Sequence, residues 1–193
     1  MCYNNADLGD VMKKVVFLDI DGVLNDNLNY FVDSCVESVI KLVDKNDASV
    51  VMITSLQGNG TKAKRNKLSN MLGEKGINVS DYIDPNFEGS LCGISISSRA
   101  LGIVDYLKNH SDVSYVILDD EFHNDYKMAC LNYYKTHTWK GFQSKEIDRI
   151  VFKKVNLNTL SNFKYGYREL GAYEKATNNV IKTLKKVIEK KSN

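Results

Sequence analysis

The sequence contains a single proline, only four cysteines in 193 residues, and no long hydrophobic run. A helix that spans a bilayer needs roughly 18–20 consecutive apolar residues, and no segment approaches that length. The first residues, MCYNNADLGDVMKK, are polar and lack the apolar segment of a secretory signal peptide. We therefore expect no membrane partner.

The cysteines form no CxxC pair and no cluster with the spacing of metal ligands. Cys35 and Cys130 lie in apolar helical patterns, which predicts that both thiols are buried. A small set of unpaired cysteines favours a reducing compartment, so we expect a cytoplasmic protein.

The chain also has almost no excess of charge of either sign, because its net charge is only +2. Such a balance does not by itself indicate a nucleic-acid-binding protein. The hydrophobic content of 43% and charged content of 26% are typical of a globular protein with a proper core.

Apolar segments of strand and helix type alternate along the chain. Strands are expected at Val15–Leu18, Ala48–Ile53, Asn78–Ile83 and Tyr115–Leu118, and helices at Phe31–Lys45, Lys62–Leu72, Arg99–Lys108 and Arg168–Lys190. The stretch Asp84–Ser97, rich in Gly and Ser, is interpreted as a loop. The alternation predicts an α/β fold, a Rossmann-like, doubly wound three-layer sandwich with a mainly parallel sheet.

The most informative stretch reads VVFLDIDGVLN, from Val15 to Asn25. Side chains on a strand alternate faces, so we expect Asp19 and Asp21 to point the same way, about 6–7 Å apart. Two crowded carboxylates repel each other unless a cation or a shared proton relieves them. Gly22 lets the chain leave the strand. The pair suits a hard divalent ion, one nucleophilic carboxylate and one carboxylate for proton transfer.

Acidic or hydroxyl residues follow three of the predicted parallel strands: Asp19 and Asp21, Thr54 and Ser55, and Asp119 and Asp120. The carboxyl ends of parallel strands meet at one edge of a sheet, where active sites of such folds gather. We therefore expect these three groups to lie together.

The string Val15–Asn25 resembles the first motif of the haloacid dehalogenase (HAD) superfamily, hhhDxDGVL. The resemblance implies that Asp19 attacks a phosphoryl group and forms an aspartyl-phosphate. It implies that Asp21 protonates the leaving oxygen and then activates a water molecule, with Gly22 among the substrate-binding residues. It also implies a Mg²⁺ ion held by Asp19, the backbone carbonyl of Asp21, and Asp120.

Three other segments resemble the remaining HAD motifs. Thr54, after VVMI, matches the hydroxyl that grips a phosphoryl oxygen, and Ser55 offers a second hydroxyl for substrate. Asp119 and Asp120, after YVIL, match the fourth motif in its DD form. There Asp120 completes the Mg²⁺ shell and Asp119 steadies the neighbouring basic group. Arg99, in SSRALGIVDYL, takes the place of the usual lysine as the catalytic, substrate-binding cation.

Two further strings, LQGNG after Ser55 and Trp139–Phe142, resemble segments of polynucleotide 3′-phosphatases and of small HAD proteins associated with RNA repair. The intervals after the first two motifs are too short for a large cap domain. An open site favours phosphate on something large, although small-molecule substrates stay open. The resemblance thus implies a capless, Mg²⁺-dependent phosphomonoester hydrolase acting on a nucleotide or nucleic-acid-end phosphate.

We expect a leader over residues 1–13, a HAD-like catalytic core over 14–150 and a C-terminal helical extension, 151–193, packed on the core. Two other functions stay open: a weak or silent HAD fold used for binding or as a scaffold, and a receiver-like phosphoacceptor module. The order of the motifs, DxD first and DD late, favours the phosphatase over the receiver. The oligomeric state is left open.

Overall fold

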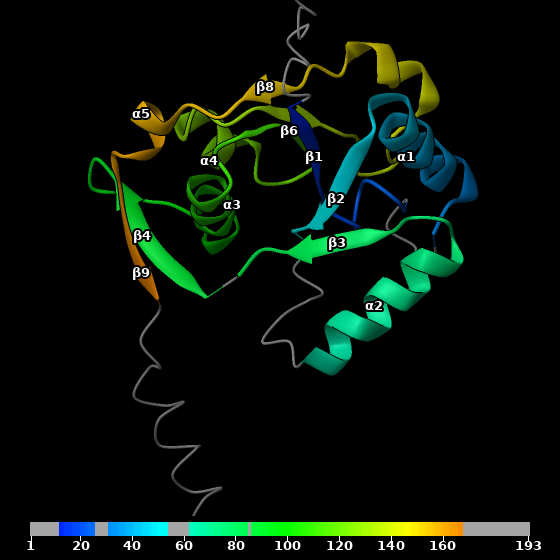
Figure 1. The fold of residues 1–193 in the computed structure, drawn as a ribbon, viewed down its shortest axis with the longest axis horizontal. Coiled ribbons are helices and arrows are strands. Elements are labelled where there is room, and N and C mark those ends of the chain that lie inside the picture. Colours follow the sequence, from blue (N-terminus) through cyan, green and yellow to red (C-terminus); the bar gives the residue numbers. More distant parts are fainter. Residues whose placement is uncertain (1–11, 26–30, 54–61, 85, 168–193) are drawn as a thin grey trace, which may run out of the picture.

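The fold is that of a computed structural model, which describes residues 12–25, 31–53, 62–84 and 86–167 (Figure 1). Residues 1–11 of the predicted leader and the predicted helix Arg168–Lys190 lie outside the described residues.

A mainly parallel sheet forms the centre of the fold (Figure 1). Its strands run parallel in the order β3-β2-β1-β6-β7, and β8 pairs antiparallel with the first half of β6. The strands are β1 (Lys13–Leu18), β2 (Ala48–Met52), β3 (Val79–Tyr82), β6 (Val113–Asp119), β7 (Tyr133–Lys135) and β8 (Lys153–Lys154). The predicted α/β class is confirmed.

Helices cover both faces of this sheet, because the apolar side chains of β1 point alternately to one face and to the other. Val15 and Phe17 pack with α3 and α4, whereas Val16 and Leu18 pack with α1 and α2. The helices are α1 (Asp33–Asn46), α2 (Lys62–Glu74), α3 (Ser98–Asn109) and α4 (His123–Met128). Because β1 buries both faces, it reads as a continuous apolar run, which is typical of a central parallel strand. The predicted three-layer sandwich is confirmed.

A second, antiparallel sheet has the order β5-β4-β9 and lies beside α3 (Figure 1). Its strands are β4 (Phe87–Leu91), β5 (Ile94–Ser95) and β9 (Phe163–Tyr167). The prediction of a loop over Asp84–Ser97 is therefore wrong. Gly and Ser lower the strand propensity of this stretch, and β9, its pairing partner, lies far away in the sequence.

The C-terminal extension also differs from the prediction in its described part. Residues 151–167 hold β8, the short helix α5 (Leu157–Leu160) and β9, so this part is largely not helical. Leu160 and Phe163 are buried in the core cluster on the α3 side of the main sheet.

The two predicted buried cysteines have different environments. Cys35 lies on the buried face of α1, as predicted. The prediction for Cys130 is wrong, because its thiol is exposed just after the end of α4. Within the described ranges, no helix is long and apolar enough to cross a membrane.

Candidate active site

Asp19 lies at the carboxyl end of β1, between β2 and β6. Its backbone N–H still donates to the carbonyl of Leu118 on β6, at 3.1 Å, which fixes the start of the following turn. Its side chain is buried, with only 3% of the residue exposed. The buried strand therefore places the Asp19 carboxylate inside the protein, at the edge of the sheet where the parallel strands end.

Arg99 lies in the first turn of α3 and reaches across to this edge. The Ser97 side chain caps the helix, so its start is well defined. One guanidinium nitrogen, Nη1, donates to Oδ2 of Asp19 at 2.8 Å and to Oδ2 of Asp119 at 2.6 Å. The guanidinium carbon lies 4.4 Å from the centre of the Phe122 ring. Arg99 thus links two carboxylates from different strands.

Burial acts to lower the pKa of Arg99, but attraction by Asp19 and Asp119 outweighs it, and the pKa lies above its ordinary value. The guanidinium therefore keeps its charge inside the protein, where a cation without partners would be costly.

Asp119 is held by four donors. Its Oδ1 accepts from the backbone N–H groups of Glu121 and Phe122, at 2.7 and 3.2 Å. Its Oδ2 accepts from Arg99 and from the Tyr126 hydroxyl, the latter at 2.7 Å. Two oxygens offer about four lone-pair positions, so this carboxylate is saturated. Burial, followed by the charge of Asp119, raises the pKa of Tyr126 well above its ordinary value, and the hydroxyl remains a donor.

Three carboxylates converge where β1 and β6 end. Oxygen atoms of Asp19, Asp119 and Asp120 lie within 4.8 Å of one another. Oδ1 of Asp19 is buried and has no hydrogen-bond partner among the described residues. Burial, with a further contribution from Asp119, raises the pKa of Asp19 to about 6, although Arg99 opposes this.

An orphaned carboxylate oxygen near two other carboxylates fits a hard divalent cation, which takes oxygen ligands. Because the hydrogen bonds of Asp119 already use its lone pairs, Asp19 and Asp120 are the carboxylates best able to hold the ion. The roles that the DD motif implies for Asp119 and Asp120 stay predictions.

The turn after Asp19 differs from a continuing strand, because β1 ends at Leu18. The Asp21 carboxylate is half-buried and accepts from the Asn25 side chain at 2.9 Å, and it does not belong to the acidic group above. Asn25 Oδ1 accepts in turn from the backbone N–H of Gly22, at 3.0 Å. The expected same-face arrangement of the two acids therefore does not apply, and a closed turn positions Asp21 instead.

Gly22 adopts a positive φ of 68°, which favours glycine. A Cβ at this position would overlap the Asp120 carboxylate. The glycine of the DxDG string therefore makes room for the second acid of the DD pair.

The structure brings Asp19, Arg99, Asp119 and Asp120 together and places Gly22 against Asp120. Thr54 and Ser55 lie outside the described residues. Sequence reasoning missed Asn25, Phe122 and Tyr126, although Asn25 stands inside the recognised string. No local pattern distinguishes Tyr126 from an ordinary core aromatic residue.

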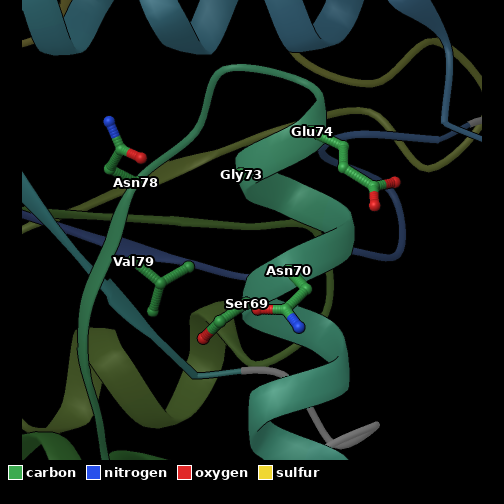
Figure 2. A pocket seen from close by; sticks show the side chains of 6 residues that line it. All are labelled: Ser69, Asn70, Gly73, Glu74, Asn78 and Val79. Atoms are coloured by element: carbon green, nitrogen blue, oxygen red, sulfur yellow. The ribbon is translucent and has the colours of Figure 1, made fainter.

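A separate hollow of about 550 Å³ lies between α2 and β3 (Figure 2). It is lined by Ser69, Asn70, Gly73, Glu74, Asn78 and Val79. Val79 begins β3, so this hollow lies at the amino end of a parallel strand, whereas the carboxylates lie at the carboxyl ends of β1 and β6. It is not part of the candidate active site.

Comparison with known proteins decides the family. The family described as "HAD domain in Swiss Army Knife RNA repair proteins" matches residues 15–147, which is more than half of the chain. The chain belongs to this HAD family. The matched residues exclude β8, α5 and β9. They include the four residues that the structure brings together: Asp19, Arg99, Asp119 and Asp120.

No curated protein matches the chain. Among solved structures, it is similar to a D,D-heptose 1.7-bisphosphate phosphatase from B. bronchiseptica, whose structure holds magnesium and phosphate. The identity is 15% and the TM-score 0.43, over 89% of this chain and 99% of that chain.

Proposed function

We propose that this HAD domain is a Mg²⁺-dependent phosphomonoester hydrolase that works through an aspartyl-phosphate on Asp19. The supporting observation is the state of Asp19: Arg99 holds its Oδ2, while its buried Oδ1 has no partner among the described residues. Because Arg99 fixes this carboxylate through Oδ2 and Oδ1 has no partner among the described residues, the carboxylate can bind a cation and contact a phosphoryl group at the same time.

In the first step, an Asp19 oxygen attacks phosphorus, and the bond from phosphorus to the leaving oxygen breaks. Asp21 donates a proton to that oxygen, which leaves as an alcohol. In the second step, Asp21 takes a proton from water as the water oxygen attacks phosphorus. The bond to Asp19 then breaks, which releases inorganic phosphate and restores the carboxylate.

Arg99 stays charged and lies against the nucleophile, so it can neutralise negative charge that builds up during transfer. Asp119 and Tyr126 hold the guanidinium in place. Mg²⁺, held by Asp19, Asp120 and the Asp21 carbonyl, would shield the carboxylates from the anionic substrate. Thr54, with Ser55, is proposed to bind phosphoryl oxygens.

The substrate is proposed to be a nucleotide or nucleic-acid-end phosphate. Between β2 and α3, the described residues hold only α2, β3 and the β4–β5 hairpin, which is too little for a large cap domain. An open site admits a phosphate at the end of a polymer. The family name, which refers to RNA repair proteins, points to the same substrate class. We also propose a cytoplasmic location, since Cys35, Cys92 and Cys130 form no disulfide.

Hydrolysis of an aryl phosphate by the purified chain, with and without Mg²⁺, tests this proposal. We expect Mg²⁺-dependent turnover, and a loss of about 10³-fold or more in kcat for Asp19→Asn, because amides are poor nucleophiles. Asp148→Asn is the matched control, since the Asp148 side chain is 86% exposed on η2 (Ser144–Arg149). It should retain full activity.

A panel of phosphomonoesters, including 3′- and 5′-phosphorylated oligonucleotides, then identifies the substrate class. Inactivity of the wild-type chain across the whole panel would contradict the proposal and favour the silent scaffold.

A further inference from the structure

Trp139 is the most exposed of the large hydrophobic side chains in the described residues, with 76% of its surface exposed. It lies in the tight turn His137–Gly141, where the backbone N–H groups of Lys140 and Gly141 both donate to the carbonyl of His137. A tryptophan at such a position exposes a large aromatic ring that folding does not use.

The turn is attached directly to the candidate active site. β7 pairs with the end of β6, and the backbone N–H of Thr136 donates to the carbonyl of Asp119 at 3.1 Å. The Thr136 hydroxyl donates to the carbonyl of Gly22 at 2.7 Å, and the N–H of Phe142 donates to the carbonyl of Val23 at 2.8 Å. Trp139 thus lies three residues from a contact with the DxDG turn, within about 11 Å along the chain.

The base of the turn is closely packed. Gly141 has a φ of +59°, and a Cβ there would lie 2.6 Å from the Cys35 sulfur. The Cys35 thiol also donates to the carbonyl of Lys140, at 3.3 Å. Packing of α1 against this turn holds the backbone of Trp139 and Lys140 in one conformation.

Basic side chains flank Trp139 in the sequence. Lys135, His137 and Lys140 are exposed on the same short segment. Lysine is depleted at the cores of protein interfaces, so an exposed aromatic residue between the exposed Lys135 and Lys140 does not resemble such a core. Proteins that bind single-stranded nucleic acid combine aromatic platforms with positive charges that follow the phosphates.

We propose that Trp139 is a stacking platform for a base near the phosphorylated end of a single-stranded nucleic acid, and that Lys135 and Lys140 bind its backbone phosphates. This inference rests on the proposed phosphatase function, because it places the polymer end at Asp19. The turn would then orient the strand toward the site and select nucleic-acid ends over small phosphate esters.

Trp139 is the only tryptophan of the chain, so its fluorescence reports on this position alone. Asp19→Asn protein with Mg²⁺ is titrated with short 5′- and 3′-phosphorylated oligonucleotides. We expect strong quenching by stacking, and much weaker quenching by matched oligonucleotides that lack the bases next to the phosphorylated end. Binding of the intact oligonucleotide without any change in fluorescence would overturn the proposal.

Variants are compared by the anisotropy of a labelled oligonucleotide. Trp139→Ala should bind roughly 5- to 100-fold more weakly, and Trp139→Phe, which keeps an aromatic face, should recover most of the loss. Lys140→Ala should lower the salt dependence of log K by about 0.7, the value for one phosphate contact on a single strand. Lys153→Ala, an exposed lysine on β8 beside the start of β6, is the control and should bind like wild type.

Other outcomes are distinguishable. Fluorescence that changes with protein concentration alone would assign the turn to self-association and overturn the proposal. Equal oligonucleotide affinity for Trp139→Ala and wild type would also overturn it. Inactivity of the wild-type chain across the whole phosphomonoester panel would refute the phosphatase, whereas the quenching titration still decides the stacking platform on its own.

Discussion

Four donors converge on the single buried carboxylate of Asp119, and they come from three parts of the chain: the turn after β6, α3 and α4. The hydrogen bond from Tyr126 is the one that can be removed with least change of shape. Asp119 and Tyr126 together determine where Arg99 lies, so the hydroxyl is expected to affect both stability and transfer.

Tyr126→Phe should lower the free energy of unfolding by about 1.5–3 kcal/mol, the range for hydrogen bonds to charged groups. It should also lower kcat more than it raises KM, since Arg99 loses part of its support. Urea unfolding and steady-state kinetics measure these effects.

Tyr165→Phe is the matched control, because the Tyr165 hydroxyl also donates to a carboxylate, that of Asp105, at 3.2 Å and nearer the surface. Its loss should be under about 1 kcal/mol. Equal losses in the free energy of unfolding for the two variants would show that burial does not strengthen the hydrogen bond from Tyr126 to Asp119.

The raised pKa of Asp19 gives a prediction for the protein without metal. The folded-state pKa of about 6 exceeds the ordinary 3.8, so the folded state binds the proton more tightly than the unfolded state. Ionised Asp19 therefore destabilises the fold. The cost grows as the pH rises from about 4 and is complete above about 6, where it reaches about 3 kcal/mol.

Asp19→Asn should consequently raise the free energy of unfolding in EDTA at pH 7.5, and the gain should shrink as the pH is lowered toward 4. Added Mg²⁺ should narrow the difference in free energy of unfolding between the two proteins at pH 7.5. The ion stabilises the wild-type protein, whose Asp19 carboxylate binds it, and not the variant. Urea unfolding at several pH values measures this, and a less stable variant at pH 7.5 in EDTA would contradict it.

At the scale of elements, the turn His137–Gly141 joins β7, α1 and the DxDG turn. Gly141→Ala would place a Cβ 2.6 Å from the Cys35 sulfur and 2.7 Å from the carbonyl oxygen of Val23, in a backbone conformation that favours glycine. We expect a loss of about 2–4 kcal/mol in the free energy of unfolding, combining steric overlap with backbone strain.

Gly93→Ala separates the two contributions. Gly93 also has a positive φ, of 83°, but nothing lies within 4 Å of an added Cβ. Its loss, measured by the same urea unfolding, should be limited to backbone strain of about 1 kcal/mol. A loss as large as that of Gly141→Ala would show that the contact with Cys35 has no effect.

Elements with strong local patterns were predictable and those without were not. The continuous apolar runs of β1, β2 and β6 and the helical periodicity of α1 and α3 identify these elements within a few residues of their ends. β4 has the pattern of a loop because Gly89 and Ser90 weaken its strand propensity, and its pairing with β9 joins Glu88 to Gly166, 78 positions apart in the sequence.

At the scale of the whole molecule, the segment after the HAD match is part of the core. Phe163 is 5% exposed and packs in the cluster that contains β1 and α3. Phe163→Ala should lower the free energy of unfolding by about 3–5 kcal/mol, through lost burial and the cavity that remains.

Val151→Ala, at a side chain that is 61% exposed, should change the free energy of unfolding by no more than about 0.5 kcal/mol. Denaturant unfolding of both variants measures the difference. A Phe163→Ala protein as stable as wild type would mean that β9 does not contribute to the folding unit.

The sequence by itself determined the fold class, the family and the edge of the sheet where acids gather, because buried parallel strands and the polar residues that end them are local patterns. Only the tertiary structure decided that Arg99 bridges Asp19 and Asp119, that Tyr126 saturates Asp119, and that the segment carrying Trp139 contacts the DxDG turn through Thr136. These relations join residues up to 114 positions apart, as between Thr136 and Gly22. Packing of whole elements, rather than the preference of any short segment, brings such residues into contact.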